Sequence, residues 1–246
     1  MRDANHDVLA FAAAHHVVLA EQVGLLLGTD ADAAKQRLAE LQDAGLIRRT
    51  RMLAIDPGCY QITSAGLAVV ASELPPPRFD PGRYRNDEGA AWVWLAATKG
   101  GNFGPVEQVL SERQMRAHDM RPSAAEPETE PPTRTQDATQ PTGLCFGLRP
   151  IGTELTPFTG LHYPDLLLIT SAGRIPIELE LSVPAAERLG AIMSAYAAQP
   201  NLRGVIYMTD DQRVAGVVKT VSGRLGISAL IHLQLIKFQT AEPARS

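Results

Sequence analysis

The sequence predicts a mixed protein of the α+β or α/β class, built from two parts. Residues 1–74 show mainly helical periodicity, whereas residues 86–240 alternate strand-like and helical patterns. The stretch ELPPPRFDPGRYR lies between them and carries four prolines, which is typical of a linker, here placed at 75–85. A chain of 246 residues is long enough to bury a sizeable core in each part.

A second compositional break falls inside the C-terminal part, at residues 121–143. This segment, RPSAAEPETEPPTRTQDATQPTG, contains no aromatic residue and no aliphatic residue larger than alanine. Such a segment cannot bury enough apolar surface to offset the entropy lost on ordering, so we expect a disordered insert.

Composition excludes several classes of protein. The net charge is −4, so any nucleic-acid contact must come from a local basic patch. The two cysteines form no CxxC pair, and no His/Cys spacing suits zinc. The first residues lack the pattern of a signal peptide, and no apolar run approaches the length of a membrane span. We therefore expect a reduced, cytoplasmic compartment and no membrane partner.

The N-terminal part reads as three helices, a strand pair and a closing helix. Acidic residues in the first turn of the third helix suit the helix dipole, and a glycine follows its last turn. A turn is expected at Asp56-Pro57-Gly58, between the two strands. The expected helices cover 7–14, 20–27, about 30–44 and 63–72, and the expected strands cover 46–53 and 59–62.

This order is that of a winged helix-turn-helix, and the text LAELQDAGLIRRTR…GCYQITSAGLAVV resembles that superfamily closely. The resemblance makes the third helix a recognition helix and the strand pair a wing. It implies binding to double-stranded DNA, with arginines on phosphates and exposed helix residues near base edges.

The local charge agrees with that expectation. Residues 35–51 hold five basic and two acidic side chains, although residues 1–72 as a whole are net negative. The alternatives are the solvated face of a small helical unit and a protein-interaction module. Because the charge is modest, we expect weak, salt-dependent binding by a monomer, with a homodimer or a partner assisting. The candidate DNA contacts are Lys35, Gln36, Arg37, Arg48, Arg49 and Arg51.

The C-terminal part is expected to contain four helices and five strands. The helices are placed at 86–98, 104–119, 184–198 and 212–225. The strands are placed at 144–148, 163–170, 175–182, 202–209 and 229–238. Strands that return through helices predict a mixed sheet with parallel members.

Carboxylates stand in two of these strands, in the text HYPDLLLITSAGRIPIELELS. The αβββαβ order and the Pro164-Asp165 pair, with Glu178 on the next strand, resemble the PD-(D/E)xK, or restriction-endonuclease-like, nuclease superfamily. The resemblance makes Asp165 and Glu178 metal ligands and Glu112 an additional acid. Converging oxygen ligands would suit Mg²⁺ or Mn²⁺, which polarises a phosphate and activates water.

Glu180 departs from that pattern, because the superfamily has lysine at this place. Three interpretations follow: the basic residue has moved, with Arg188 as a candidate; the site uses Asp165, Glu178, Glu180 and Glu112 as its only catalytic groups; or hydrolysis is lost and the fold is kept for binding. A plain amphipathic strand with both glutamates in solvent is the remaining alternative. His162 is either a contact to metal or phosphate or an exposed loop residue.

Both parts together resemble the replication-relaxation family of actinobacterial plasmids and mobile elements, whose second motif is typically Glu-x-acid. The resemblance implies a nucleoid- or plasmid-associated DNA-binding protein of plasmid replication, relaxation or transfer, or of transcription control, with a degenerate nuclease-like unit. Replication or conjugation proteins are the partners it suggests. The alternatives are a divalent-metal-dependent DNA endonuclease and a protein-interaction adaptor.

Overall fold

The computed structural model describes residues 4–51, 58–99, 101, 103–120, 146–150, 160–200 and 202–237. Within them the chain is a mixed α+β protein with one five-stranded mixed sheet, which confirms the predicted class at that level. The predicted insert at 121–143 and the Asp56-Pro57 part of the turn lie outside the described residues. None of the described helices is long and apolar enough to cross a membrane.

The N-terminal unit has the predicted order of elements. Its two strands pair antiparallel, and Val18 adds an isolated bridge to Tyr60. The elements are α1 (Ala4–Ala14), α2 (Ala20–Leu27), α3 (Ala31–Asp43), β1 (Ile47–Thr50), β2 (Cys59–Ile62) and α4 (Ser64–Val69).

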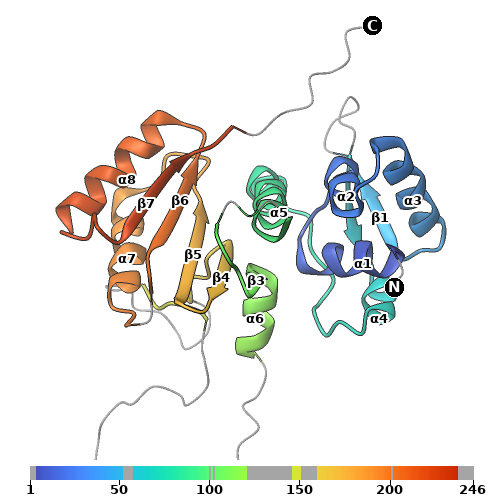
Figure 1. Ribbon diagram of the computed structural model, residues 1–246, viewed down its shortest axis with the longest axis horizontal. Helices are drawn as coiled ribbons and strands as arrows, with labels where there is room; N and C mark the ends of the chain where they lie inside the picture. Colours follow the sequence, from blue (N-terminus) through green and yellow to red (C-terminus); the bar gives the residue numbers. More distant parts are fainter. Residues whose placement is uncertain are drawn as a thin grey trace, which may run out of the picture.

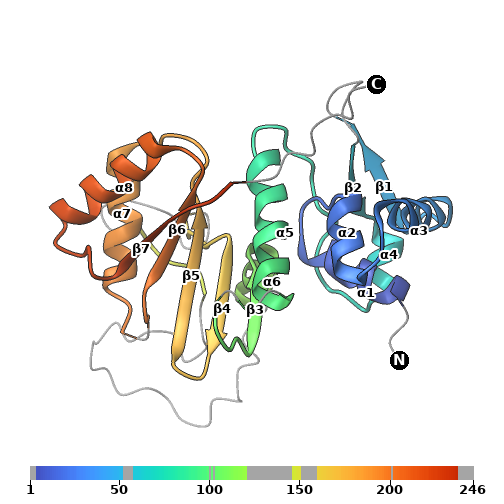
Figure 2. The same cartoon turned by 45° about the horizontal axis from the view of Figure 1, so that its top comes forward.

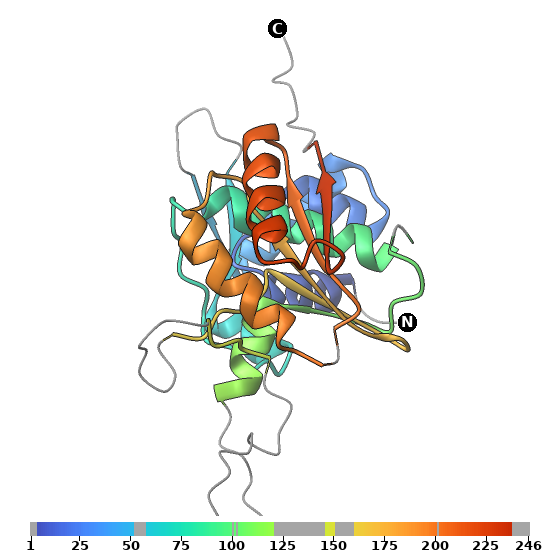
Figure 3. The same cartoon turned by 90° about the vertical axis from the view of Figure 1, so that its left-hand side faces the viewer.

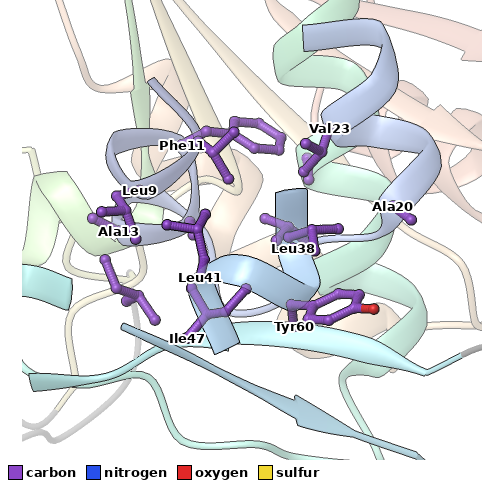
Figure 4. Packing of buried hydrophobic residues seen from close by; sticks show 14 of the residues in the cluster. Leu9, Phe11, Ala13, Ala20, Val23, Leu38, Leu41, Ile47 and Tyr60 are labelled. Atoms are coloured by element: carbon purple, nitrogen blue, oxygen red, sulfur yellow. The ribbon is translucent and has the colours of Figure 1, made fainter. Parts of the chain in front are cut away.

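Local sequence explains where these elements begin and end. Gly28 adopts a left-handed conformation with φ of 68°, which ends α2 and turns the chain toward α3. The Asp30 side chain accepts a hydrogen bond from Ala33 N at 2.8 Å and caps α3. Apolar side chains from the helices and strands then meet in one core, where Leu38 and Leu41 of α3 lie close to Ile47 (Figure 4).

The sheet has the strand order β3-β4-β5-β6-β7. The first three strands form an antiparallel meander, and β6 and β7 continue it in parallel, because helices return the chain between them. The strands are β3 (Gln108–Ser111), β4 (Leu166–Thr170), β5 (Gly173–Leu179), β6 (Val205–Thr209) and β7 (Ile231–Leu235); the helices are α5 (Tyr84–Lys99), α6 (Glu112–Met120), α7 (Ala186–Ala197) and α8 (Gln212–Arg224).

Helices lie on both faces of this sheet (Figure 1). α7 and α8 cover one face, where Tyr196 and Val218 pack with Tyr207 of β6 (Figure 3). α5 lies against the other face, where Val93 packs with Ile177 of β5. Alternation along the strands therefore sends neighbouring residues into two different cores.

α5 belongs to both halves of the molecule, since it lies between the sheet and the N-terminal helices (Figures 1 and 2). Ala91 and Leu95 enter the N-terminal core, whereas Val93 and Ala97 enter the core beneath the sheet. Polar contacts reinforce this junction: buried Arg113 of α6 donates to Ala13 O at 3.0 Å and to Pro75 O at 2.6 Å.

Two predictions for the C-terminal part are wrong. The helix expected at 104–119 is instead β3 followed by α6, and β3, not 144–148, opens the sheet. Val109 and Leu110 point into different cores, so β3 shows no apolar–polar alternation. Of residues 146–148, only Leu148 pairs, through an isolated bridge to His162. α5 also begins at Tyr84, inside the expected linker.

Candidate functional site

Three carboxylates lie side by side at one end of the sheet. Glu112 follows β3, Asp165 precedes β4, and Glu178 lies near the end of β5. Because these strands pair antiparallel, their register brings the three residues together, and Glu112 N donates to Asp165 O at 3.1 Å. We call Glu112, Asp165 and Glu178 the carboxylate row. The structure thus assembles three of the four predicted catalytic acids.

Asp165 is tied to the neighbouring strand. Its Oδ2 accepts a hydrogen bond from Leu179 N at 2.7 Å. Part of the residue is reachable from the pocket, but the carboxyl lies so deep that burial raises its pKa well above the usual value, and the nearby Glu178 adds to the rise. The group is therefore stabilised in its protonated form.

Glu178 is buried, so it is not the solvent-facing residue of a plain amphipathic strand. Its Oε1 lies 2.6 Å from His162 Nε2 and accepts a hydrogen bond from the hydroxyl of Tyr196. Burial alone would lower the pKa of His162, but Glu178 outweighs it and raises that pKa above its usual value. Glu178 thus favours the protonated form of the ring.

Glu112 joins two arginines. Its Oε2 accepts from Arg83 at 2.8 Å, and its Oε1 accepts from Arg116 Nε at 2.8 Å. Burial would raise the pKa of Glu112, yet the two guanidinium groups hold it below the usual value. Glu112 is therefore an ionised residue whose charge is neutralised within the chain.

A pocket of about 980 Å³ opens over this end of the sheet and is lined by the carboxylate row and by Glu180. Burial, followed by the charge of Glu178, raises the pKa of Glu180 to about 7. Arg188 of α7 also lines the pocket, and its charge opposes that rise. All four predicted acids and the predicted substitute for lysine thus face one cavity.

The candidate DNA contacts on α3 have local partners. Lys35 forms an ion pair with Asp32 at 3.3 Å, and Gln36 Nε2 donates to Glu40 at 3.3 Å. Arg37 donates to Asn5 Oδ1 at 2.6 Å, so it reaches back to α1. Lys35 and Gln36 are exposed, whereas Arg37 is half-buried.

The strand pair carries the larger exposed positive charge. Arg48, Arg49 and Arg51 are all exposed. Arg48 donates to Gln61 Oε1 at 3.0 Å and to Pro77 O at 3.2 Å, so part of its bonding capacity is used within the chain. Arg49 lies over the ring of Tyr60, 5.8 Å from its centroid. Arg48 and Arg49 thus each make a contact within the chain while remaining exposed.

The residues as placed do not fit a divalent metal. No group of three or more His, Cys, Asp or Glu among the described residues has the geometry to hold an ion. In addition, one oxygen of Asp165, one of Glu178 and both of Glu112 already accept bonds from the chain.

Several residues of the site were not predicted. Glu112 and Arg116 are four residues apart, the ordinary spacing of an ion pair on one face of a helix. This spacing could have predicted that Arg116 pairs with Glu112. Arg83 and Tyr196 are brought in by tertiary packing, and nothing in the sequence around them indicated it.

Comparison of the chain with protein-family models, with curated proteins and with solved structures finds no match in any of the three. The chain's own geometry is thus the ground for a functional proposal.

Asp87, beside the site on α5, gives a pH-dependent prediction. The residue is 8% exposed, and burial, assisted by Glu112, raises its pKa to about 7. Since the unfolded chain releases this proton near the ordinary value of 3.8, this group's contribution to stability falls as the pH rises from about 4 to about 7. We expect Asp87→Asn to stabilise the protein by about 2 kcal/mol near pH 8 and by less near pH 5.

Urea unfolding of both proteins at the two pH values measures this difference. Asp43→Asn is the matched control, because Asp43 is exposed at the end of α3 and should give no pH-dependent gain. A gain from Asp87→Asn that is equal at both pH values would contradict the burial argument.

Proposed function

We propose that the chain is a double-stranded DNA-binding protein, in which the N-terminal unit acts as a winged helix-turn-helix. The observation that carries the proposal is the exposed arginine group on the strand pair, Arg48, Arg49 and Arg51, beside α3. Arginines at this place would contact phosphates and fix the orientation of the protein on the duplex. The order of three helices, a strand pair and a closing helix supports it.

α3 would contribute less charge than the strand pair. It holds two basic residues against Asp32, Glu40 and Asp43. Base contacts by Lys35 and Gln36 would require these side chains to leave their acidic partners. We therefore expect a phosphate-dominated, salt-sensitive interaction with modest sequence preference.

In this proposal the sheet unit is a nuclease-like unit that does not cut efficiently. The antiparallel meander followed by a parallel strand, with acids at the meander's end, supports the likeness to PD-(D/E)xK nucleases. Glu180 in place of lysine, together with the engaged carboxylate row, argues against cutting. The role that fits this combination is maintenance of a plasmid or mobile element, as in the replication-relaxation family, or transcription control.

Fluorescence anisotropy with a short labelled duplex tests DNA binding. The triple variant Arg48→Ala/Arg49→Ala/Arg51→Ala should bind more weakly, and the slope of log K against log salt should fall by up to about 0.9 for each phosphate that is no longer neutralised. A matched variant removes the same charge from exposed residues of the sheet unit, namely Arg203→Ala/Lys219→Ala/Arg224→Ala.

Equal weakening by the two triple variants would contradict the assignment of the strand pair. Absence of binding by the wild-type protein at low salt would overturn the proposal and favour a protein-interaction role. Thermal unfolding of each variant shows whether removal of the Arg48 bonds to Gln61 and Pro77 has disturbed the fold.

A further inference from the structure

We infer that donors of the chain itself engage the carboxylate row, with the His162 ring against Glu178 in the space next to that carboxylate, and that removing this ring opens a latent divalent-cation site between Asp165 and Glu178. The inference concerns the sheet unit alone and stands whether or not the N-terminal unit binds DNA.

Two of the oxygens around Asp165 are already engaged. Mg²⁺ and Mn²⁺ need several oxygen ligands close to an octahedral arrangement. Asp165 Oδ2 accepts from Leu179 N at 2.7 Å, and the carbonyl oxygen of Leu179 accepts from Asn86 Nδ2 at 3.0 Å. A cation bound here would have to replace these bonds or use the second oxygen of Asp165 together with a ligand from Glu178.

Oε1 of Glu178 could not provide that ligand while His162 is in place. Both the imidazole and the Tyr196 hydroxyl meet Oε1, and the ring of His162 stands edge-on to that of Tyr196, with centroids 6.2 Å apart. The imidazole lies in a buried position, only 17% exposed at its side chain, so it cannot swing out without unpairing Glu178. His162 thus both pairs with the carboxylate and fills the space next to it.

Glu112, the third member of the row, also has its oxygens engaged by donors of the chain. Glu112 binds the guanidinium groups of Arg83 and Arg116 with its two oxygens. Arg116 in turn lies over the ring of Tyr163, 4.4 Å from its centroid, which fixes the guanidinium. Two arginines therefore neutralise Glu112, and the His162 ring meets Glu178, so donors of the chain occupy positions that a metal would need.

One fully buried polar atom at the pocket has no hydrogen-bond partner among the described residues, and it is a neutral one. Tyr207, paired with Glu178 in the strand register, lines the pocket and is almost fully buried, yet its hydroxyl has no hydrogen-bond partner. Among the described residues, the unused bonding capacity at the pocket floor thus includes a hydroxyl beside Glu178. The Tyr207 hydroxyl could therefore bind a further polar group, such as a water on a bound cation, once the ring of His162 is removed.

Titration with Mn²⁺, followed by electron paramagnetic resonance, tests the inference. His162→Ala should bind one Mn²⁺ at least about tenfold more tightly than wild type, a change of the size seen when groups around a metal site are altered. The gain should be abolished in His162→Ala/Asp165→Asn. His6→Ala is the control, since His6 is exposed on α1 and its removal should change nothing. Circular dichroism checks that each variant is folded.

Two outcomes would overturn the inference: one Mn²⁺ bound by wild type and absent in Asp165→Asn, or a His162→Ala variant that binds no more tightly than His6→Ala. Should His162→Ala not fold, NMR of the wild-type protein decides the question. The chain has six histidines, and the ring signals of His162 should stay sharp on addition of a small fraction of Mn²⁺. Selective broadening of these signals would show that a cation binds in the carboxylate row of the wild-type protein. It would refute the inference that donors of the chain exclude a cation there.

Discussion

Gly66→Ala is expected to destabilise the N-terminal unit by about 3 kcal/mol or more, since overpacking against backbone leaves no simple relaxation. A Cβ at this position would lie 2.1 Å from Leu46 O and 2.7 Å from a side-chain carbon of Ile62. Leu46 O cannot move away freely, because it accepts from Thr63 N and from the Thr63 hydroxyl. The same hydroxyl caps α4 by accepting from Gly66 N.

Urea unfolding measures the effect, and Gly216→Ala provides the matched comparison. Gly216 also lies inside a helix, α8, but a Cβ there would meet nothing within 4 Å. That variant should stabilise the protein by about 0.5–1 kcal/mol, the ordinary difference between alanine and glycine in a helix. Similar changes in unfolding free energy from the two substitutions would contradict this explanation. Close approach to Leu46 would then not be the reason for a glycine at position 66, in the motif Tyr60-x-x-Thr63-x-x-Gly66.

Arg113→Met is expected to cost about 2–4 kcal/mol and to weaken the junction between the two units. Methionine keeps an apolar stem but leaves the carbonyls of Ala13 and Pro75 without the guanidinium that now reaches both. Burial lowers the pKa of Arg113 to about 10, so the residue is still charged at neutral pH, with Glu112 and Asp87 nearby.

Tryptophan fluorescence is a suitable probe of this junction, because both tryptophans lie on α5 and pack against the N-terminal core. We expect fluorescence and far-ultraviolet circular dichroism to report one unfolding transition in wild type and two separate transitions in Arg113→Met. Arg224→Met, at an exposed arginine of α8, should change stability by less than about 0.5 kcal/mol. Coincident transitions in Arg113→Met would show that α5 alone couples the units.

The sequence predicted much of the carboxylate row because short-range rules determine it. The Pro164-Asp165 pair opens one strand, a tight turn follows, and side-chain alternation places Glu178 beside Asp165. The bounds of the third helix of the N-terminal unit followed from the acidic residues of its first turn and from the glycine after its last turn. Patterns of this kind extend over a few residues and are independent of the rest of the chain.

What the sequence could not predict depends on contacts between distant segments. Strand β3 has apolar side chains on both faces because α5 covers one side and α6 with Tyr163 the other. The engagement of Glu112 requires Arg83, 29 residues earlier, and that of Glu178 requires Tyr196, 18 residues later. These partners determine whether an acid is a free ligand or a neutralised one, so the chemistry of the row was the least predictable part.

The position of α5 limits how this protein can be divided or recombined. A helix that fills two cores at once cannot be assigned to either half, and a boundary at the Pro-rich stretch would leave Val23 and its neighbours without the cover that Ala91 and Leu95 give them. A fragment meant to carry the N-terminal unit alone would need to retain α5 and would then expose the apolar side that faces Ile177. Cutting the chain between the two halves is therefore expected to expose apolar surface on either side of α5.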